Sequence, residues 1–249
     1  MKLLVLGGTR DAKTLALALH NNGVEVIYSI AGLVRQPDLP CTVISGGFSS
    51  RGGLVQYITD NHITALLDAT HPFATKMSQT VTAASEQLKI TLWRYQRPDW
   101  IATPTDDWHF FDQWDDLLGA LAPYQSIFLT QGQLTEPMLT ALFRHRTNAQ
   151  RFIHRTAVEP KHLAPEWMQW VQGIGPFSLE HELELIKKNQ IKALVSKHSG
   201  GELPSKLLAA RTLGMPVLLL SQTTTTQPSH ADRAFTDIAM LVNAMMVGN

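Results

Sequence analysis

The sequence predicts an α/β protein in which short buried strands alternate with amphipathic helices. Apolar runs of about five residues recur along the chain, and each ends in glycine, proline or polar residues. After most of these runs, apolar residues return at the spacing i, i+3, i+4, i+7, which marks one face of a helix. Strands that alternate with helices in this way form parallel sheets covered by helices.

Composition limits the size of the protein and its possible partners. The 249 residues suffice for one large or two modest α/β domains, and 44% of them are hydrophobic, which is ample for a core. Basic and acidic residues number 21 each, so the chain has no global field that would attract nucleic acid or an anionic membrane. The single cysteine, Cys41, excludes an intramolecular disulfide. No apolar run approaches membrane-spanning length, and we expect a cytoplasmic protein.

The first strand, over residues 2–6, ends in a glycine turn. Gly7 and Gly8 end the apolar run, and a helical pattern begins directly after Arg10 and Asp11. A strand, a glycine turn and a helix present helix N-terminal amides to a phosphate, as in the Rossmann fold. Against the fingerprint G-x-G-x-x-G, Gly7 fits the first position, but Thr9 stands at the second, where its hydroxyl could bind phosphate. On this motif alone, a nucleotide site and a plain strand–helix turn are equally supported.

The second and third strands, over residues 24–28 and 42–45, bear on the cofactor. In dinucleotide-binding folds an acid at the end of the second strand holds the ribose of NAD(H). This strand ends without an acid, in Ser29-Ile30-Ala31-Gly32. Arg10 and Arg35 would suit a 2′-phosphate, which favours NADPH, although both could be ordinary surface charges. The third strand is followed by Gly46 and Gly47.

The fourth strand, over residues 64–67, carries a polar cluster at its end, Asp68-Ala69-Thr70-His71-Pro72-Phe73. The carboxyl ends of parallel strands are where open α/β sheets bind ligands. His71 is therefore a candidate proton donor, or a residue that orients the nicotinamide ribose, or merely a capping residue. Pro72 suits the first turn of the next helix. A fifth strand over residues 91–94 leads into Arg97.

A polar stretch at residues 102–107 is interpreted as a link between two domains. We expect a dinucleotide-binding domain over residues 1–103 and a second α/β domain over residues 104–249. Each would be Rossmann-like with a mostly parallel sheet, and an interdomain cleft would lie between them. The second domain is predicted to contain strands at 108–111, 126–130, 151–154, 193–196 and 216–220, and helices at 112–121, 136–143, 180–188, 204–213 and 235–247.

Two strand ends in the second domain carry ligand-binding residue types. Thr130-Gln131-Gly132-Gln133 follows one strand, and Ser196-Lys197-His198-Ser199-Gly200-Gly201 follows another, with Lys206 on the next helix. Lys197, Ser199, the Gly200 amide and Lys206 would form a nest for a carboxylate or phosphate; the alternative is a solvated loop. Motifs of hydrolases, P-loop proteins and zinc proteases are absent, and no histidines have metal-ligand spacing, so no metal is expected.

Together these clusters resemble the precorrin-6A reductase family of cobalamin biosynthesis, which includes enzymes acting on cobalt-precorrin-6A. The resemblance covers nearly the whole chain. It lies in Leu6–Ala12, Ser29–Gly32, Gly46–Phe48, Asp68–Ala74, Arg94–Pro98, Leu129-Thr130, Gly175–Phe177 and Ser196–Gly201 with Lys206. The chain departs from the family pattern at Gln131-Gly132-Gln133, where relatives usually carry Thr-Gly-Arg or Thr-Gly-Ser.

The resemblance implies hydride transfer from NADPH, with NADH possible, to one double bond of a carboxylate-rich tetrapyrrole. No activated nucleophile is needed, because the cofactor delivers the hydride. The protein would be a monomer or a homodimer. The implied cofactor-binding residues are Gly7, Gly8, Thr9, Arg10, Asp11, Ser29, Ala31, Gly32, Arg35, Gly46, Gly47, Thr70, His71 and Pro72. The implied substrate-binding residues are Phe73, Arg94, Arg97, Thr130, Gly132, Lys197, Ser199, Gly200 and Lys206.

Two other functions compete with this one. A non-catalytic dinucleotide sensor would keep the glycine turn but would not need the cluster around Lys197. A reductase or epimerase of a small sugar-like substrate would use a Tyr-x-x-x-Lys pair. That pair is absent, because the four tyrosines are followed four residues later by Gly32, Asn61, Asp99 and Phe128.

Overall fold

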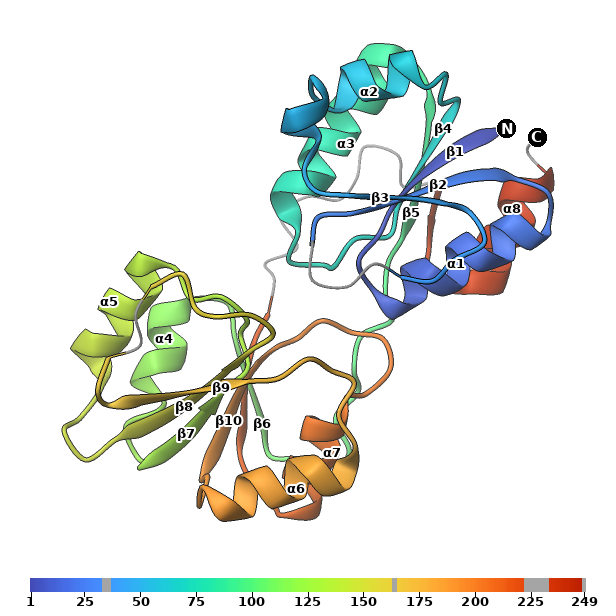
Figure 1. The fold of residues 1–249 in the computed structure, drawn as a ribbon. Helices are drawn as coiled ribbons and strands as arrows, with labels where there is room; N and C mark the ends of the chain where they lie inside the picture. Colours follow the sequence, from blue (N-terminus) through green and yellow to red (C-terminus); the bar gives the residue numbers. More distant parts are fainter. Residues whose placement is uncertain (33–36, 163–164, 222–232, 248–249) are drawn as a thin grey trace. The chain divides into compact units, whose positions relative to one another are not determined.

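The computed structural model describes residues 1–32, 37–162, 165–221 and 233–247. The chain divides into two compact units (Figure 1). The first unit comprises Met1–Pro98 with Thr224–Asn249, and the second comprises Asp99–Thr223. Each unit contains one six-stranded sheet, and every pairing between described strands is parallel, which confirms the predicted fold class.

The sheet of the first unit has the strand order β12-β5-β4-β1-β2-β3. Helices α1 and α8 pack on one face, and α2, α3 and the 3-10 helix η1 pack on the other. The elements are β1 (Lys2–Leu6), α1 (Arg10–Asn21), β2 (Glu25–Ile30), β3 (Thr42–Ser45), η1 (Phe48–Arg51), α2 (Leu54–Asp60), β4 (Ala65–Asp68), α3 (Thr75–Leu88), β5 (Thr91–Tyr95), β12 (Ala234–Phe235) and α8 (Ile238–Val247).

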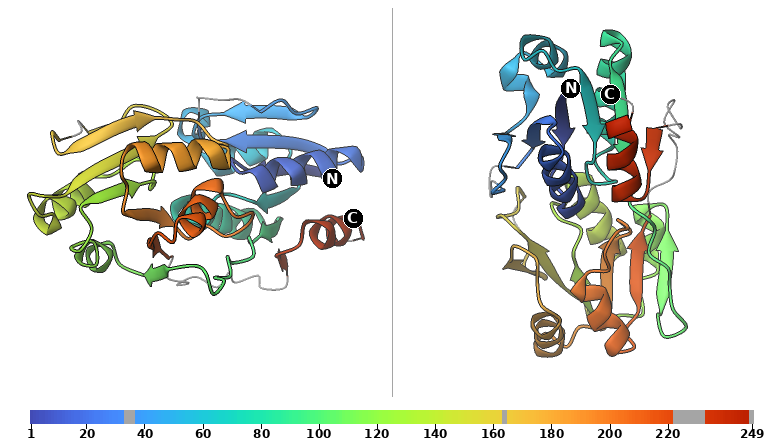
Figure 2. Two further views of the ribbon diagram at one scale, coloured as in Figure 1. Left: turned by 90° about the horizontal axis from the view of Figure 1, so that it is seen from below. Right: turned by 90° about the vertical axis from the view of Figure 1, so that its right-hand side faces the viewer.

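Sequence pattern explains the packing of α1 and α8. The residues of α1 at the i, i+3, i+4, i+7 positions are all buried against the sheet: Ala12, Leu15, Ala16 and Leu19. Leu241 and Met245 of α8 enter the same core, and the two helices lie beside each other (Figure 2). The apolar, methionine-containing C-terminal helix is therefore a core element of the first unit.

The sheet of the second unit has the order β6-β11-β10-β7-β8-β9. Helices α4 and α5 pack on one face, and α6 and α7 pack on the other. The elements are β6 (Trp108–Phe111), α4 (Trp114–Gly119), β7 (Ser126–Leu129), α5 (Glu136–His145), β8 (Arg151–Thr156), β9 (Met168–Gln172), α6 (Leu179–Lys188), β10 (Ala193–Lys197), α7 (Ser205–Thr212) and β11 (Val217–Leu220).

The two sheets share one topology, and each takes its edge strand from an unexpected part of the chain. β6 follows β5 in sequence, but it pairs with β11 in the second sheet. β12 follows β11 in sequence, but it pairs with β5 in the first sheet, through Ala234↔Arg94 and Phe235↔Tyr95. The chain therefore passes from one unit to the other twice.

This division differs from the expected boundary between residues 103 and 104. The second unit begins at Asp99, because the Trp100 indole is buried in its core and donates a hydrogen bond to the Gly201 carbonyl oxygen at 3.0 Å. The polar stretch interpreted as a link is ordered, since the Asp106 carboxylate accepts two hydrogen bonds from Arg211 at 2.9 Å. The last helix belongs to the first unit and not to the second.

Smaller differences concern single elements. The structure adds β9, η1 and β12, which the sequence pattern did not indicate. Helix α3 begins at Thr75, so Pro72 precedes the helix instead of lying in its first turn. Within the described parts of the chain, no helix has the length and apolar character needed to cross a membrane.

Candidate functional sites

Each sheet has a topological switch point, a position where strands on either side are added in opposite directions. In the first sheet it lies between β1 and β4, and in the second it lies between β7 and β10. Ligands of open α/β sheets bind outside the carboxyl ends of the strands at such points. Because all strands are parallel, each unit gathers the predicted strand-end residues at one edge of its sheet.

The glycine turn at the first switch point is shaped by Tyr28 of β2. The Tyr28 side chain is fully buried, and its hydroxyl accepts a hydrogen bond from the Gly8 amide at 2.9 Å. A Cβ at Gly7 would lie 2.4 Å from the tyrosine ring, so only glycine fits there. Gly8 has φ +108° and nothing within 4 Å of its Cβ position, which leaves its backbone open to a ligand. Burial, only partly offset by the Gly8 hydrogen bond, raises the pKa of Tyr28 and keeps the phenol neutral.

The Thr9 hydroxyl has a structural role. It accepts a hydrogen bond from the Ala12 amide at 3.1 Å, which caps α1, and donates one to the Ala69 carbonyl oxygen at 3.2 Å. These bonds hold the end of β1 against the end of β4 across the switch point. The structure thus gives this hydroxyl a capping role, and its expected contact with phosphate stays a prediction.

Asp68 and Arg94 face each other from neighbouring strands. The buried Asp68 carboxylate accepts hydrogen bonds from the Thr70 amide at 3.1 Å and hydroxyl at 2.7 Å. The Arg94 guanidinium lies 3.5 Å from the same carboxylate and donates to the Thr82 hydroxyl at 3.1 Å. Arg94 is thus held within the first unit by the Asp68 carboxylate.

Arg97 also has an acidic partner. Its guanidinium lies 2.7 Å from the carboxylate of Asp11, in the first turn of α1. The neighbouring Tyr95 has a raised pKa, first because it is partly buried and second because of the negative charge of Asp11. The pair brings a predicted substrate residue and a predicted cofactor residue together beside the glycine turn.

Most of the remaining predicted residues of the first unit lie at the carboxyl ends of β2, β3 and β4. Ser29 is buried, whereas Ala31 and Gly32 are exposed, as is Arg10 at the start of α1. Gly46 has φ +91° and Gly47 precedes η1 as its N-cap. The His71 Nδ1 atom accepts a hydrogen bond from the Phe73 amide at 3.2 Å, consistent with a local turn. Arg35 lies outside the described residues.

At the second switch point, Lys206 of α7 meets Thr130 at the end of β7. The Lys206 ammonium donates a hydrogen bond to the Thr130 hydroxyl at 2.8 Å. That hydroxyl in turn donates to the Val195 carbonyl oxygen at 2.9 Å, so it can only accept from the lysine. Lys206 is partly exposed as a residue, but its ammonium lies among protein atoms. Burial first, and then the positive charges of Arg155 and Lys197, lower the pKa of Lys206 to about 7.

A buried ion pair lies near this lysine. Arg155 of β8 donates to both carboxylate oxygens of Glu182 on α6, at 3.0 and 2.7 Å. The guanidinium also lies 3.8 Å from the centre of the Phe177 ring and 4.8 Å from that of Phe128. Neither residue was singled out from the sequence, because the partners are 27 positions apart on different elements.

The glycine-containing loop after β10 is fixed by aromatic residues. His198 packs edge-on against Trp100 and Phe110, with ring centres 5.2 and 5.5 Å apart. Gly200 and Gly201 have φ +61° and +79°, a conformation that favours glycine. Lys197 is partly buried, which lowers its pKa, and Ser199 is also partly buried. The loop thus holds its backbone in a fixed form between the end of β10 and α7, the helix that carries Lys206.

The loop after β7 contains a buried glutamine, Gln131, which is only 2% exposed. Within the described parts of the chain, neither of its side-chain amide atoms has a hydrogen-bond partner. The next residue, Gly132, has φ +77°, and its carbonyl oxygen accepts a hydrogen bond from His154 Nε2 at 2.7 Å. Burial of His154 lowers its pKa and favours the neutral ring.

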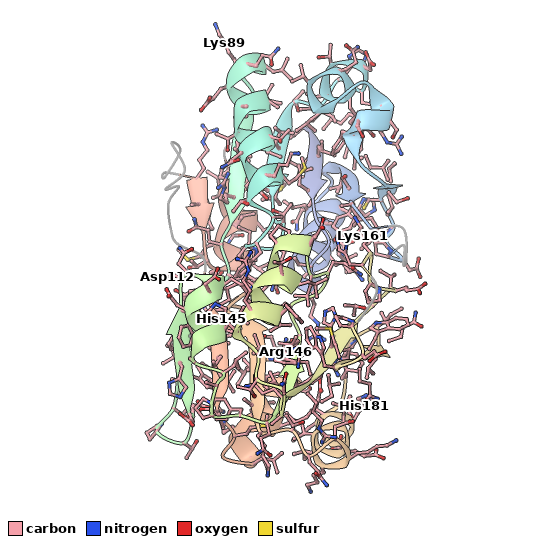
Figure 3. All side chains as sticks on the ribbon, turned by 90° about the vertical axis from the view of Figure 1, so that its left-hand side faces the viewer. Lys89, Asp112, His145, Arg146, Lys161 and His181 are labelled. Carbon is pink, nitrogen blue, oxygen red and sulfur yellow. The ribbon has the colours of Figure 1, made fainter. Side chains whose placement is uncertain are left out.

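Gln133 ties this loop to the loop after β8. Its side chain donates to the Glu159 carbonyl oxygen at 3.2 Å and accepts from the backbone amide of Lys161 at 3.0 Å. Lys161 is labelled in Figure 3. The departure from the family pattern at this position therefore has a local structural explanation. Among the residues that the structure describes, no group of three or more potential ligands could hold a metal ion.

Comparison with known proteins gives the family. A family model described as precorrin-6x reductase CbiJ/CobK matches residues 2–245. The chain belongs to this precorrin-6x reductase family. A precorrin-6A reductase of Rhodococcus erythropolis is 35% identical over 223 residues, which are 88% of each chain. A cobalt-precorrin-6A reductase of Priestia megaterium is 24% identical over 230 residues, covering 88% of this chain and 90% of the relative.

A solved structure also resembles the whole chain. It is named CobK precorrin-6A reductase, has a TM-score of 0.83 and is 29% identical, and the match covers 99% of this chain and 97% of that chain. Membership of the precorrin-6x reductase family confirms the resemblance inferred from the sequence. It also makes this chain a reductase, which disfavours a non-catalytic sensor.

Proposed function

We propose that the chain reduces one double bond of the precorrin-6A macrocycle to give the 6B form in cobalamin biosynthesis, with NADPH as reductant. The observation that carries the substrate assignment is the Lys206–Thr130 contact at the second switch point. A buried cation at a strand end suits a ligand with carboxylate side chains. Family membership supplies the reaction class.

The first unit fits a dinucleotide. The open backbone at Gly8, followed directly by the N-terminus of α1, suits a pyrophosphate. β2 ends at Ile30 and is followed by Ala31 and Gly32, without the acid that would repel a 2′-phosphate. These features support NADPH over NADH and a pyrophosphate contact at Gly7–Arg10.

The second unit fits a polycarboxylate. Lys197 and Lys206 are two partly or fully desolvated cations in a chain whose formal net charge is zero. Local cations of this kind are worth more than surface charges, because water screens them less. Ser199, Gly200, Thr130 and Gly132 would complete the substrate contacts with hydroxyl and backbone groups.

We infer that the natural substrate is the metal-free macrocycle. The support is the higher identity to a precorrin-6A reductase, 35%, than to a cobalt-precorrin-6A reductase, 24%, over similar lengths. Relative kcat/KM values for the metal-free and cobalt-loaded substrates test this inference. A preference for the cobalt form would contradict it.

The protein's chemical task is to bind and orient. When bound, the nicotinamide supplies the hydride, so the chain needs no nucleophile. His71 remains the candidate residue for the accompanying proton or for holding the nicotinamide ribose. Exchange of His71 for asparagine would separate these roles, since loss of kcat with unchanged KM for NADPH indicates proton transfer.

The test is reduction of purified precorrin-6A with NADPH or NADH, monitored through the absorption change of the macrocycle.

Gly8→Glu should abolish NADPH binding, because the glutamate side chain would fill the pyrophosphate position. Gly23→Glu is the matched control, since Gly23 also has a positive φ and open surroundings but lies at the far end of α1.

Lys197→Ala should weaken tetrapyrrole binding more than NADPH binding. Absence of both binding and turnover in the wild-type protein would refute the proposed function.

The setting of the reaction is part of the proposal. We place it in the cytoplasm, where NADPH is available and the single Cys41 would stay reduced. The active species would be a monomer or a homodimer, which sedimentation of the purified protein would distinguish.

A further inference from the structure

We propose that Lys206 takes up a proton when a carboxylate of the tetrapyrrole binds at the second switch point, so that substrate binding is coupled to protonation of the protein. This inference rests on the proposed function for the nature of the ligand. It concerns the second unit alone and goes beyond simple attraction of an anion.

The hydrogen bonds of Lys206 leave its ammonium incompletely satisfied. A protonated lysine has three donors. Among the residues that the structure describes, Lys206 has one acceptor, the neutral Thr130 hydroxyl, whose own hydrogen is donated to the Val195 carbonyl oxygen. Buried cations in proteins are normally paired with an anion or fully hydrogen-bonded.

The charged neighbours of Lys206 do not supply the missing anion. They are Arg155 on β8, Glu182 on α6 and Lys197 on β10. Both oxygens of Glu182 are occupied by Arg155 in a two-bond pair, so its charge is largely compensated. The cluster carries one net positive charge with Lys206 neutral and two with Lys206 protonated. A ligand carboxylate would reduce this excess.

The position of Lys206 in α7 also disfavours its protonated form. It is the second residue of an eight-residue helix, where the positive end of the helix dipole disfavours a cation and favours an anion. A lysine at this unfavourable position is expected where a bound anion compensates for its positive charge.

Together these surroundings give Lys206 a pKa of about 7, so that the side chain is close to half-protonated at neutral pH. A carboxylate close to the ammonium raises this pKa, because an opposite charge stabilises the protonated form. The protonated form binds the anion better, so affinity should be highest below pH 7. It should fall as the pH rises above 7, by up to about tenfold per pH unit.

Calorimetric titration of the wild-type protein with precorrin-6A, without dinucleotide, tests the coupling. At pH 8, in buffers of different ionisation enthalpy, we expect an uptake approaching one proton per bound tetrapyrrole, that is roughly 0.5–1. Binding without proton uptake would overturn this inference and leave the proposed function intact. Absence of both binding and turnover would overturn the two together.

Three variants test whether Lys206 is the group that takes up the proton. Lys206→Met should bind the tetrapyrrole more weakly, without proton uptake. Lys206→Arg should bind without proton uptake and with little change in affinity between pH 6.5 and 8.5, because a guanidinium stays charged. Lys192→Met is the matched control, since Lys192 is exposed, lies directly before β10 and should leave proton uptake unchanged. Thermal denaturation of each variant checks that it is folded. Unchanged proton uptake in folded Lys206→Met would assign the proton to another group.

Discussion

The guanidinium of Arg97 lies 2.7 Å from the carboxylate of Asp11, and this pair sits beside the glycine turn of the first unit. Asp11 alone would place a negative charge in the first turn of α1, close to the proposed pyrophosphate position. Arg97 compensates for that charge. From this arrangement we expect Arg97 to contribute to dinucleotide binding, whereas the family resemblance implied a substrate contact.

Arg97→Ala should therefore weaken NADPH binding, because the Asp11 carboxylate becomes uncompensated. A change of about 1 kcal/mol, or roughly fivefold in Kd, is expected for a pair that is partly exposed. Fluorescence titration with NADPH measures the effect. The double variant Arg97→Ala with Asp11→Asn should recover most of the lost affinity. Unchanged NADPH affinity combined with weaker tetrapyrrole binding would return Arg97 to the substrate.

Gly7→Ala should destabilise the protein by roughly 1–3 kcal/mol, the usual cost of overpacking. The reason is the 2.4 Å approach of its Cβ to the ring of Tyr28. Urea denaturation measures the loss. In a Tyr28→Leu background the same change should cost less, because the ring atoms that it meets are gone. Equal costs in both backgrounds would show that Tyr28 is not what requires glycine.

Stability should fall as the pH drops below about 6.5, through the titration of His154. Burial lowers the pKa of His154 below its ordinary 6.5, and the Gly132 carbonyl only accepts, so the neutral ring carries its hydrogen on Nε2. As the pH falls, His154 of the unfolded chain is protonated at a higher pH than His154 of the folded chain. Protonation therefore favours the unfolded state and lowers the free energy of unfolding. Denaturation at pH 7.5, 6.5 and 5.5 measures the trend. His154→Gln should flatten it, because glutamine can donate to Gly132 without titrating.

Gln131→Leu should raise the free energy of unfolding of the ligand-free protein by roughly 1–3 kcal/mol, since two buried polar atoms without partners are removed. The matched variant Gln133→Leu should lower it, because Gln133 donates to Glu159 and accepts from Lys161. Thermal and urea denaturation compare the two. A loss of stability in Gln131→Leu would reveal a partner, such as a bound water, for this amide.

Most helices and strands could be predicted because their patterns are local. The apolar spacing of α1 and the buried run of β1 determine those elements almost unaided. β9 was missed because Met168–Gln172 alternates apolar and polar residues only weakly, and β12 because two residues carry no pattern. The exchange of edge strands could not be predicted, since it depends on pairing between segments more than a hundred residues apart, Arg94 and Ala234 for example.

The candidate sites were predictable to the extent that parallel strands bring their ends together. This placed Lys197 and Lys206 in one predicted nest and Thr130 at another strand end, and the structure gives the Lys206–Thr130 contact. What the sequence could not show is which polar groups are already satisfied. The pairing of Arg94 with Asp68 leaves no local signature, whereas the capping by Thr9 follows from its place directly before α1. The surroundings of Lys206, including Arg155 and Glu182, likewise depend on tertiary packing.

The pairing of β12 with β5 has a consequence for synthesis on the ribosome. The first sheet and its α1 face are not complete until residues 234–247 have emerged, although residues 1–98 are made first. Until then, this face of the sheet lacks the apolar residues that α8 adds to its core, Leu241, Val242 and Met245. A fragment ending at Pro98 should therefore aggregate, and the proposed NADPH-binding capacity of a nascent chain should appear only after β12 and α8 have emerged.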